Sequence, residues 1–192
     1  MKKQTNIVFS QLKDIPLAAL DGKSSSTLSQ VCEGRQGVVL SMLRRFGCVL
    51  CRDGAAQLST IKSDLDALNV GLVGVAPEHL GQDEFTKDGG YFKGDLFCAN
   101  FGCNRYAQTT RASIFSLLRP SVWKAASEAK SRGKDGNFQG DGLQLGGTFV
   151  FDCASGEVLF AHYQEHFGDH PDPQEVLKVV KDHFSAKEAD TQ

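Results

Sequence analysis

The sequence predicts one α/β domain, a central mixed β-sheet with helices on both faces. Short apolar runs alternate with stretches whose apolar residues recur at steps of three and four, so strands alternate with helices. The chain has 192 residues and is 41% hydrophobic, which is enough for one full-sized core. No linker or internal repeat divides the chain. We therefore expect a single domain over residues 1–192, with a frayed polar tail at 186–192.

The first predicted elements are short. Residues 6–20 are expected to hold a short strand and an apolar segment, and the Asp-Gly pair within 20–23 then supplies a hairpin turn. The polar run 24–31 is interpreted as the cap of a short helical turn. An apolar run after a glycine predicts a buried parallel strand over 36–44.

The middle of the chain predicts a helix between two strands. Residues 51–68 place their apolar side chains in one stripe at helical spacing, with Arg52 among the residues facing water. Residues 70–76 read as a second buried strand, ended by Pro77. A short helix over 78–85 and a short strand over 94–99 are expected to follow.

The last third predicts a hairpin and a closing helix. Helical stretches are expected at 103–108 and 111–132, the latter bent or broken at Pro120, and a glycine-rich loop follows. The remaining elements are a hairpin of strands 147–152 and 157–163 and an amphipathic helix over 172–184. A β–α–β unit followed by β–β–α is the thioredoxin-type layout, with a right-handed first crossover.

Composition excludes several classes of function. The formal net charge is −2, so no basic excess indicates nucleic-acid binding. No apolar run is long enough for a membrane span, and the start of the chain has no apolar leader segment, so a cytoplasmic protein is expected. In that reducing compartment six cysteines are weak support for structural disulfides, and their irregular spacing disfavours a zinc site.

The stretch "RRFGCVLCRDGAAQLS" (44–59) carries the strongest chemical signal. A strand, a short loop and a helix place Cys48 at the helix N-terminus and Cys51 in its first turn. Free backbone N–H groups, the helix dipole and nearby arginines favour a thiolate there. We expect Cys48, as the more exposed sulfur, to attack and the buried Cys51 to resolve. The alternatives are two core thiols or half of a metal site.

The cysteine segment and four later segments resemble those of a known family. The segments "RRFGCVLCRDGAAQLS", "LVGVAPEHLGQDEF", "YFKGDLF", "GNFQGDGLQLGGTFVF" and "HFGD", in that order, resemble the peroxiredoxin-like 2 family of the thioredoxin-like superfamily. That family includes a prostamide/prostaglandin F synthase branch and a redox-regulatory, selenoprotein U-type branch. The similarity runs from about Leu20 to Phe184 and shares features with both branches.

The resemblance implies a thioredoxin-like fold and a metal-free active site built on Cys48 and Cys51. In the prostaglandin branch such a pair reduces an endoperoxide, and a thioredoxin-type donor that draws on NADPH restores the dithiol. The resemblance implies no bound cofactor. The expected chemistry is attack of a thiolate on a peroxide oxygen, a sulfenic acid on Cys48, and condensation with Cys51. Within enzymes the alternative is a protein disulfide reductase. Outside them it is a redox sensor without turnover.

The sequence departs from true peroxiredoxins. Their Pro-x-x-x-Thr-x-x-Cys segment would need proline at Ser41 and threonine at Arg45, and their distant arginine would fall at Gly146. Ordinary hydrogen-peroxide catalysis is therefore disfavoured. Arg45 could replace both donors with a bidentate fork, or could simply be solvated at a strand end. Gly146 and Gly147 are expected opposite the cysteines, where they either admit a substrate or form a tight turn.

The histidines and the other cysteines are given mainly structural rather than catalytic interpretations. His162, His166 and His170 lie at steps of four but not on one helix, so surface or capping histidines are favoured over metal ligands. Cys98 and Cys103 are either incidental or a second redox pair. Cys32 and Cys153 are read as ordinary thiols, with Cys153 exposed in a turn. The substrate, the electron donor and the oligomeric state stay open.

Overall fold

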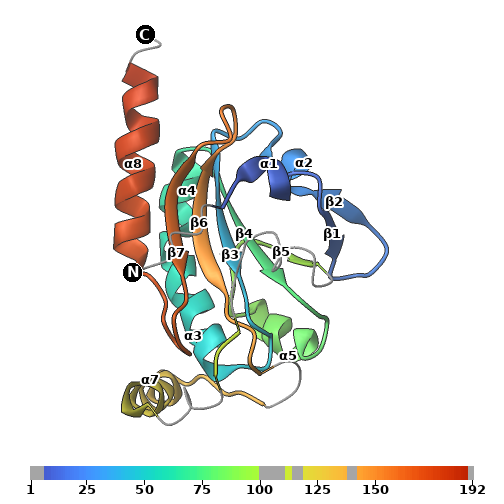
Figure 1. Cartoon of the computed structure of the whole chain (residues 1–192), viewed down its shortest axis with the longest axis vertical. Coiled ribbons are helices and arrows are strands. Elements are labelled where there is room, and N and C mark those ends of the chain that lie inside the picture. The colour runs from blue at the N-terminus through green and yellow to red at the C-terminus, as the bar shows by residue number, and fades with distance from the viewer. Residues whose placement is uncertain (1–6, 100–110, 114–118, 138–141, 190–192) are drawn as a thin grey trace.

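A seven-stranded mixed sheet forms the centre of the molecule (Figure 1). The computed structural model describes residues 7–99, 111–113, 119–137 and 142–189. The strand order is β2-β1-β5-β4-β3-β6-β7, with β3, β4 and β5 parallel and the other pairs antiparallel. The strands are β1 (Pro16–Ala19), β2 (Ser25–Thr27), β3 (Gly37–Met42), β4 (Val70–Ala76), β5 (Asp95–Cys98), β6 (Gly147–Asp152) and β7 (Val158–Tyr163). The predicted mixed sheet is confirmed.

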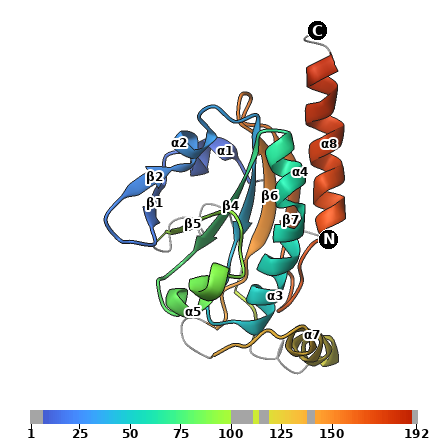
Figure 2. The same cartoon turned by 180° about the vertical axis from the view of Figure 1, so that it is seen from behind.

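Helices cover both faces of this sheet. They are α1 (Phe9–Leu12), α2 (Leu28–Cys32), α3 (Val49–Leu58), α4 (Lys62–Ala67), α5 (Gln82–Thr86), α7 (Pro120–Ser131) and α8 (Pro173–Ala189), with 3₁₀ turns at Ser59–Ile61 and Lys87–Gly89. Figure 2 shows α3 and α4 in front of the sheet, with α7 at the end where α3 begins. The predicted three-layer α/β architecture is therefore the observed one.

Alternation along β3 divides the core between the two faces. Val39 joins the cluster formed with α3, α4, α5 and α8. Val38, Leu40 and Met42 point the other way, toward α1, α2 and β1. All six residues of β3 are buried, as expected of a central strand covered on both faces. This rigid strand carries the chain to the thiol pair.

The N-terminal elements differ in part from the prediction. Residues 9–12 form helix α1 rather than a strand, although the hairpin of β1 and β2 turns where Asp-Gly predicts it. Thr27 caps α2 as expected: its side chain accepts from the Gln30 N–H, and the Gln30 side chain accepts from the Thr27 N–H.

The helix predicted over 51–68 is interrupted. A 3₁₀ turn at Ser59–Ile61 separates α3 from α4. Ser59 Oγ donates to the Ala55 carbonyl at 2.7 Å and Thr60 Oγ1 to the Gln57 carbonyl at 2.7 Å, and such bonds to the preceding turn bend helices.

The boundaries of the last two helices complete the comparison. Helix α7 begins at Pro120, which agrees with the predicted break there, because a proline at the first helical position needs no N–H partner. The closing helix α8 continues to Ala189, so the first part of the expected tail is helical. The helix predicted over 103–108 lies outside the described residues. Within the described stretches, no helix has the length and apolarity needed to cross a bilayer.

Candidate active site

The two cysteines of the C-x-x-C segment open helix α3. After β3 the chain turns through residues 43–47, and Cys48 is the N-cap residue of α3, with extended backbone angles (φ −76°, ψ 121°). The Arg52 N–H donates to the Cys48 carbonyl at 3.0 Å and closes the first turn around Cys51. This is the placement predicted from the strand–loop–helix pattern.

Both sulfurs are buried. Cys48 is 6% exposed and Cys51 is 1% exposed. As predicted, Cys48 is the more exposed sulfur and Cys51 is buried, although Cys48 is itself covered. An apolar cluster containing Leu50, Val122 of α7 and Phe167 encloses the pair. Access to Cys48 requires some opening of this cover.

The two thiols have opposite pKa shifts. The pKa of Cys48 is lowered to about 5, chiefly because the Cys51 thiol donates a hydrogen bond to its sulfur, with help from Arg44 and the Cys51 N–H against the opposing effect of burial. The pKa of Cys51 is raised because its proton is held in that same bond and because it is buried. The lowered pKa predicted for Cys48 is confirmed.

Arg44 is the cation that contacts the sulfur. Its Nη1 donates to Cys48 Sγ at 3.3 Å, while Nε and Nη2 donate to the carbonyls of Gln144 (2.8 Å) and Gly142 (2.6 Å). Its guanidinium carbon lies 4.1 Å from the centre of the Phe167 ring. Arg44 is only 3% exposed, and a buried cation is costly unless an anion faces it. A Cys48 thiolate supplies that anion.

The neighbouring arginines contribute less to the sulfur. Arg45 is buried and lowers the pKa of Cys48 only as the smallest of the named causes. Its expected role toward peroxide oxygens stays a prediction.

Arg52 corrects an expectation, because it is 2% exposed rather than facing water. Its Nε donates to the Phe46 carbonyl at 2.9 Å, Nη1 to the Asp135 carbonyl at 3.0 Å, and Nη2 bonds Glu84 of α5 at 2.8 Å. These contacts hold the loop before Cys48. Arg52 therefore supports the site through the backbone and not through charge on the sulfur.

A series of hydrogen bonds links the C-terminal third of the chain to the start of α3. Gln164 Oε1 accepts from the Gly146 N–H at 2.9 Å, Gln164 Nε2 lies 3.1 Å from His170 Nδ1, and His170 Nε2 lies 3.0 Å from the Leu50 carbonyl. Burial lowers the pKa of His170 to about 4. The neutral ring therefore donates from Nε2 to Leu50 and accepts at Nδ1 from Gln164.

Sequence reasoning missed His170, which it took for a surface or capping histidine. The available signal was Gly54, a glycine inside a helix. A Cβ at Gly54 would lie 2.6 Å from the His170 ring, so only glycine lets the ring pack against α3.

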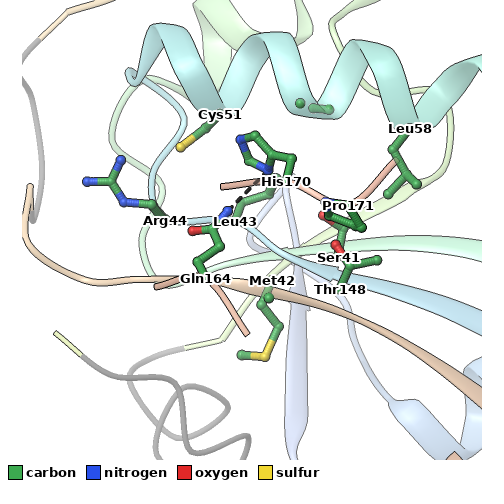
Figure 3. Close-up of a pocket in the computed structure, with 13 residues that line it drawn as sticks. Ser41, Met42, Leu43, Arg44, Cys51, Leu58, Thr148, Gln164, His170 and Pro171 are labelled. Atoms are coloured by element: carbon green, nitrogen blue, oxygen red, sulfur yellow. Dashed lines mark hydrogen bonds between the residues drawn. The ribbon is translucent and has the colours of Figure 1, made fainter. Parts of the chain in front are cut away.

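A narrow cavity lies beside Cys51 (Figure 3). Arg44, Gly147, Gln164 and His170 are among the residues that line it with Cys51. Its volume is about 10 Å³, which is room for roughly one water molecule. The closed site therefore has no space for a bulky substrate next to the resolving sulfur.

The two glycines expected opposite the cysteines occupy different surroundings. Gly147 begins β6 and lines the cavity with Cys51. At Gly146 an added Cβ would overlap the Met42 carbonyl, so close backbone packing accounts for that glycine. A substrate-binding role for either residue stays a prediction.

Helix α7 is fastened over α3 by a paired ionic contact. Arg132 at the C-terminal end of α7 donates from Nε and Nη2 to the two carboxylate oxygens of Asp53, at 2.8 and 2.7 Å. Gln57 adds a bond to Asp53 at 2.6 Å. Asp53 is 6% exposed, and its pKa is lowered by Arg132 and Gln57 against the effect of burial.

The remaining candidates lie elsewhere. Cys98 is buried in β5, where burial raises its pKa to about 11, and Cys103 lies outside the described residues. His162 pairs with Asp169 at 3.2 Å. In the portions of the chain that are described, no group of three His, Cys, Asp or Glu residues could hold a metal ion.

Comparison with known proteins identifies the family. The family model described as AhpC/TSA antioxidant enzyme matches residues 57–166. The prostamide/prostaglandin F synthase of Danio rerio is 38% identical over 152 residues, 76% of this chain and 74% of that protein. The peroxiredoxin-like 2A of Homo sapiens is 32% identical over 181 residues, 94% of this chain and 79% of that protein. This chain belongs to the peroxiredoxin-like 2 family.

Solved structures agree on the fold of this peroxiredoxin-like 2 protein. Xanthomonas campestris peroxiredoxin Q superposes with a TM-score of 0.62 at 16% identity, covering 93% of this chain and 97% of that one. Reduced Plasmodium vivax 2-Cys peroxiredoxin superposes with a TM-score of 0.55 at 15% identity, over 91% of this chain and 79% of that one. At such identities the likeness shows the thioredoxin-like fold alone. With the family, it makes the protein a thioredoxin-like oxidoreductase of the thiol-dependent peroxidase type.

Proposed function

We propose that this protein reduces an organic peroxide or endoperoxide with the Cys48–Cys51 dithiol. The supporting observation is the state of Cys48: its sulfur accepts hydrogen bonds from the Cys51 thiol and from Arg44, which hold it as a thiolate at neutral pH. The matched family region starts at residue 57, so the role of the two cysteines is part of the proposal.

With a hydroperoxide, the Cys48 thiolate attacks the terminal oxygen and the O–O bond breaks. The alkoxide leaves and takes a proton, and Cys48 becomes a sulfenic acid. Cys51 then attacks the Cys48 sulfur, water leaves, and a disulfide forms. Arg44 lies against the attacking Cys48 sulfur and balances the negative charge there until the thiolate is consumed.

With an endoperoxide, both oxygens carry carbon. Attack on one oxygen therefore gives a sulfenate ester on Cys48 and an alkoxide on the same molecule. Cys51 displaces the second oxygen as an alcohol, and the substrate leaves as a diol. In both cases a thioredoxin-type dithiol in the reducing cytoplasm restores the pair by two exchange steps, with electrons from NADPH.

The small cavity gives a reason to consider a second function. That function is protein disulfide reduction. About 10 Å³ beside Cys51 does not admit a prostaglandin-sized molecule, so a large substrate must meet Cys48 at an opened surface. A protein disulfide meets a dithiol in that way.

A coupled assay separates these functions. Full-length reduced protein, thioredoxin, thioredoxin reductase and NADPH are mixed with cumene hydroperoxide, prostaglandin H₂ or insulin. Each rate is taken as the excess over the same mixture without the protein, because thioredoxin by itself reduces insulin disulfides. Peroxide-dependent NADPH oxidation is expected with at least one of the two peroxides. Activity on insulin alone would reject the peroxide reaction, and no turnover with any substrate would favour a sensor.

Variants test the named residues in the same assay. C48S is expected to abolish turnover, and C51S to allow one turnover that then stalls. The matched control is C98S, which removes a buried thiol outside the site and is expected to retain activity. Sustained turnover by C51S would show that another thiol resolves the intermediate.

A further inference from the structure

A second pair of cysteines meets at the other end of the sheet. Cys32 ends helix α2, and Cys153 follows β6 in the turn to β7. They are 121 positions apart in the sequence (153 − 32), and their spacing gives no hint of contact. In the fold both side chains pack on the same apolar cluster of the α1–α2 face, close enough for a hydrogen bond between the two sulfurs to shift the pKa of each. Cys153 lies in the turn where it is predicted, but it is only partly exposed.

Backbone contacts fix the two residues in place. The Cys153 N–H donates to the Gln36 carbonyl at 3.0 Å, directly before β3, and the Arg35 N–H donates to the Cys32 carbonyl at 3.0 Å. Cys32 belongs to the apolar cluster on the α1–α2 face of the sheet, and Cys153 packs against that cluster. Sulfurs held in hydrogen-bonding contact need only a small side-chain adjustment to reach the roughly 2 Å of a disulfide bond.

The two sulfurs have different reactivities. The pKa of Cys32 is lowered, mainly by the hydrogen bond from the Cys153 thiol and also by the charge of Arg35, against burial and Asp152. Cys32 is 8% exposed, so a small oxidant suits it better than a bulky disulfide. The pKa of Cys153 is raised by the same bond, and this half-buried residue keeps its proton. The pair has one thiolate-prone and one protonated sulfur.

This pair cannot exchange directly with Cys48 and Cys51. Cys153 lies beside the start of β3, whereas Cys48 follows the end of that strand. Six strand residues span about 20 Å. Figure 1 shows α2 and the β6–β7 turn at the end of the sheet opposite to the start of α3.

We propose that Cys32 and Cys153 form a second, independent redox site, a reversible disulfide that ties α2 to the β6–β7 turn. The oxidant is hydrogen peroxide. The Cys32 thiolate attacks one oxygen, the O–O bond breaks, and the leaving hydroxide takes a proton to become water. Cys153 then attacks the sulfenic sulfur, its proton leaves with the hydroxyl group as a second water, and the S–S bond forms.

Peptide mapping tests this directly. Reduced full-length protein is treated with graded hydrogen peroxide, alkylated, and digested with trypsin without reductant. The sequence isolates each site: Cys32 falls in peptide 24–35, Cys153 in 135–178, and Cys48 with Cys51 in 46–52. A cross-linked species of 24–35 and 135–178 is expected, and dithiothreitol should remove it. If these two peptides carry only free thiols or separate S-oxides while 46–52 is oxidised, the proposal fails.

Variants check independence and folding. The cross-linked species is expected to form in C48S as in the wild type, and a requirement for Cys48 would overturn the independence of the site. Oxidation should raise the Tm of C48S by about 5–10 °C, because the bond closes a long loop. Oxidation should not raise the Tm of C48S/C32S or C48S/C153S, because neither variant can form the disulfide. Matching Tm values of the reduced proteins show that the serine variants fold.

Discussion

Arg44 and Arg45 are neighbours with different effects on the reactive sulfur. Arg44 is buried, donates to Cys48 Sγ, and has its remaining donors fixed by two carbonyls. Arg45 acts on the pKa of Cys48 only through a weaker charge interaction. At the scale of single residues, the fixed geometry of one guanidinium therefore contributes more than the number of arginines nearby.

Replacing each arginine separately tests this asymmetry. In R44M, the pH midpoint for alkylation of Cys48 by iodoacetamide should rise from about 5 by about one pH unit, because the thiolate loses its contacting cation. In R45M, the matched control, the midpoint should rise less. An equal rise in both variants would contradict a special role for Arg44.

The buried, neutral His170 predicts how the free energy of unfolding changes at acid pH. Its pKa is about 4 in the folded protein, against 6.5 ordinarily. As the pH falls from 6.5 to 4, the unfolded chain therefore takes up a proton that the folded chain refuses, and the free energy of unfolding falls. Between these pH values wild type should lose about 2–3 kcal/mol more than H170N, measured by urea unfolding. An identical loss in both proteins would contradict the buried neutral ring.

Sequence reasoning at this scale found the two cysteines but not their neighbours. The C-x-x-C spacing, the strand before it and the helix after it are local features, so Cys48 and Cys51 could be placed in advance. The carbonyls of Gly142 and Gln144 and the ring of His170 reach the site from about a hundred residues away. No local pattern encodes such contacts, so a single sequence considered by itself does not reveal them.

At the scale of elements, helix α3 depends on what packs against it. His170 fills the space that Gly54 leaves open, and Asp53 binds Arg132 of α7. The sequence predicted α3 from its apolar stripe but placed its end at residue 68. Side-chain bonds from Ser59 and Thr60 to the preceding turn end it earlier, and an apolar periodicity that continues through a bend does not reveal them.

Gly54→Ala tests the packing of His170 on α3. Alanine favours an exposed helix by up to about 1 kcal/mol. At Gly54 it should instead destabilise the protein by about 1–3 kcal/mol in urea unfolding, because the added Cβ meets the ring. G142A is the matched control and should be nearly neutral, since nothing lies within 4 Å of its added Cβ. Combining G54A with H170A should recover part of the loss.

The Asp53–Arg132 contact predicts how α7 controls access to the thiols. R132A should weaken the seal, so amides of α7 should exchange hydrogen faster and Cys48 should be alkylated several-fold faster at pH 7. The side chain of Arg132 is 45% exposed, so the cost to global stability should be about 1 kcal/mol or less. If the amides of α7 exchange faster but the alkylation rate of Cys48 is unchanged, α7 does not control access to the thiols.

At the scale of the whole molecule, one sheet with an apolar core on each face organises the fold. Its layout was predictable because buried strands and amphipathic helices alternate in a thioredoxin-type order, and a right-handed crossover leaves few other arrangements. The meeting of Cys32 with Cys153 was not predictable, because it depends on how α2 and the β6–β7 turn share one face of the sheet.

One continuous sheet with a core on each face predicts a single unfolding transition. Calorimetric and van't Hoff enthalpies of the reduced protein should agree, with a ratio of about 1. Far-UV circular dichroism should follow the same curve. Two resolved transitions would indicate that part of the sheet unfolds on its own.

The late position of residues 142–170 in the chain has a consequence for synthesis. On the ribosome, Cys48 emerges long before the carbonyls that orient Arg44 and the ring that supports Leu50. A nascent chain that ends before residue 142 therefore lacks the partners that orient Arg44 against Cys48. Full activation of that thiol therefore waits until residues 142–170 have been made, and a shorter nascent chain is correspondingly less open to premature oxidation.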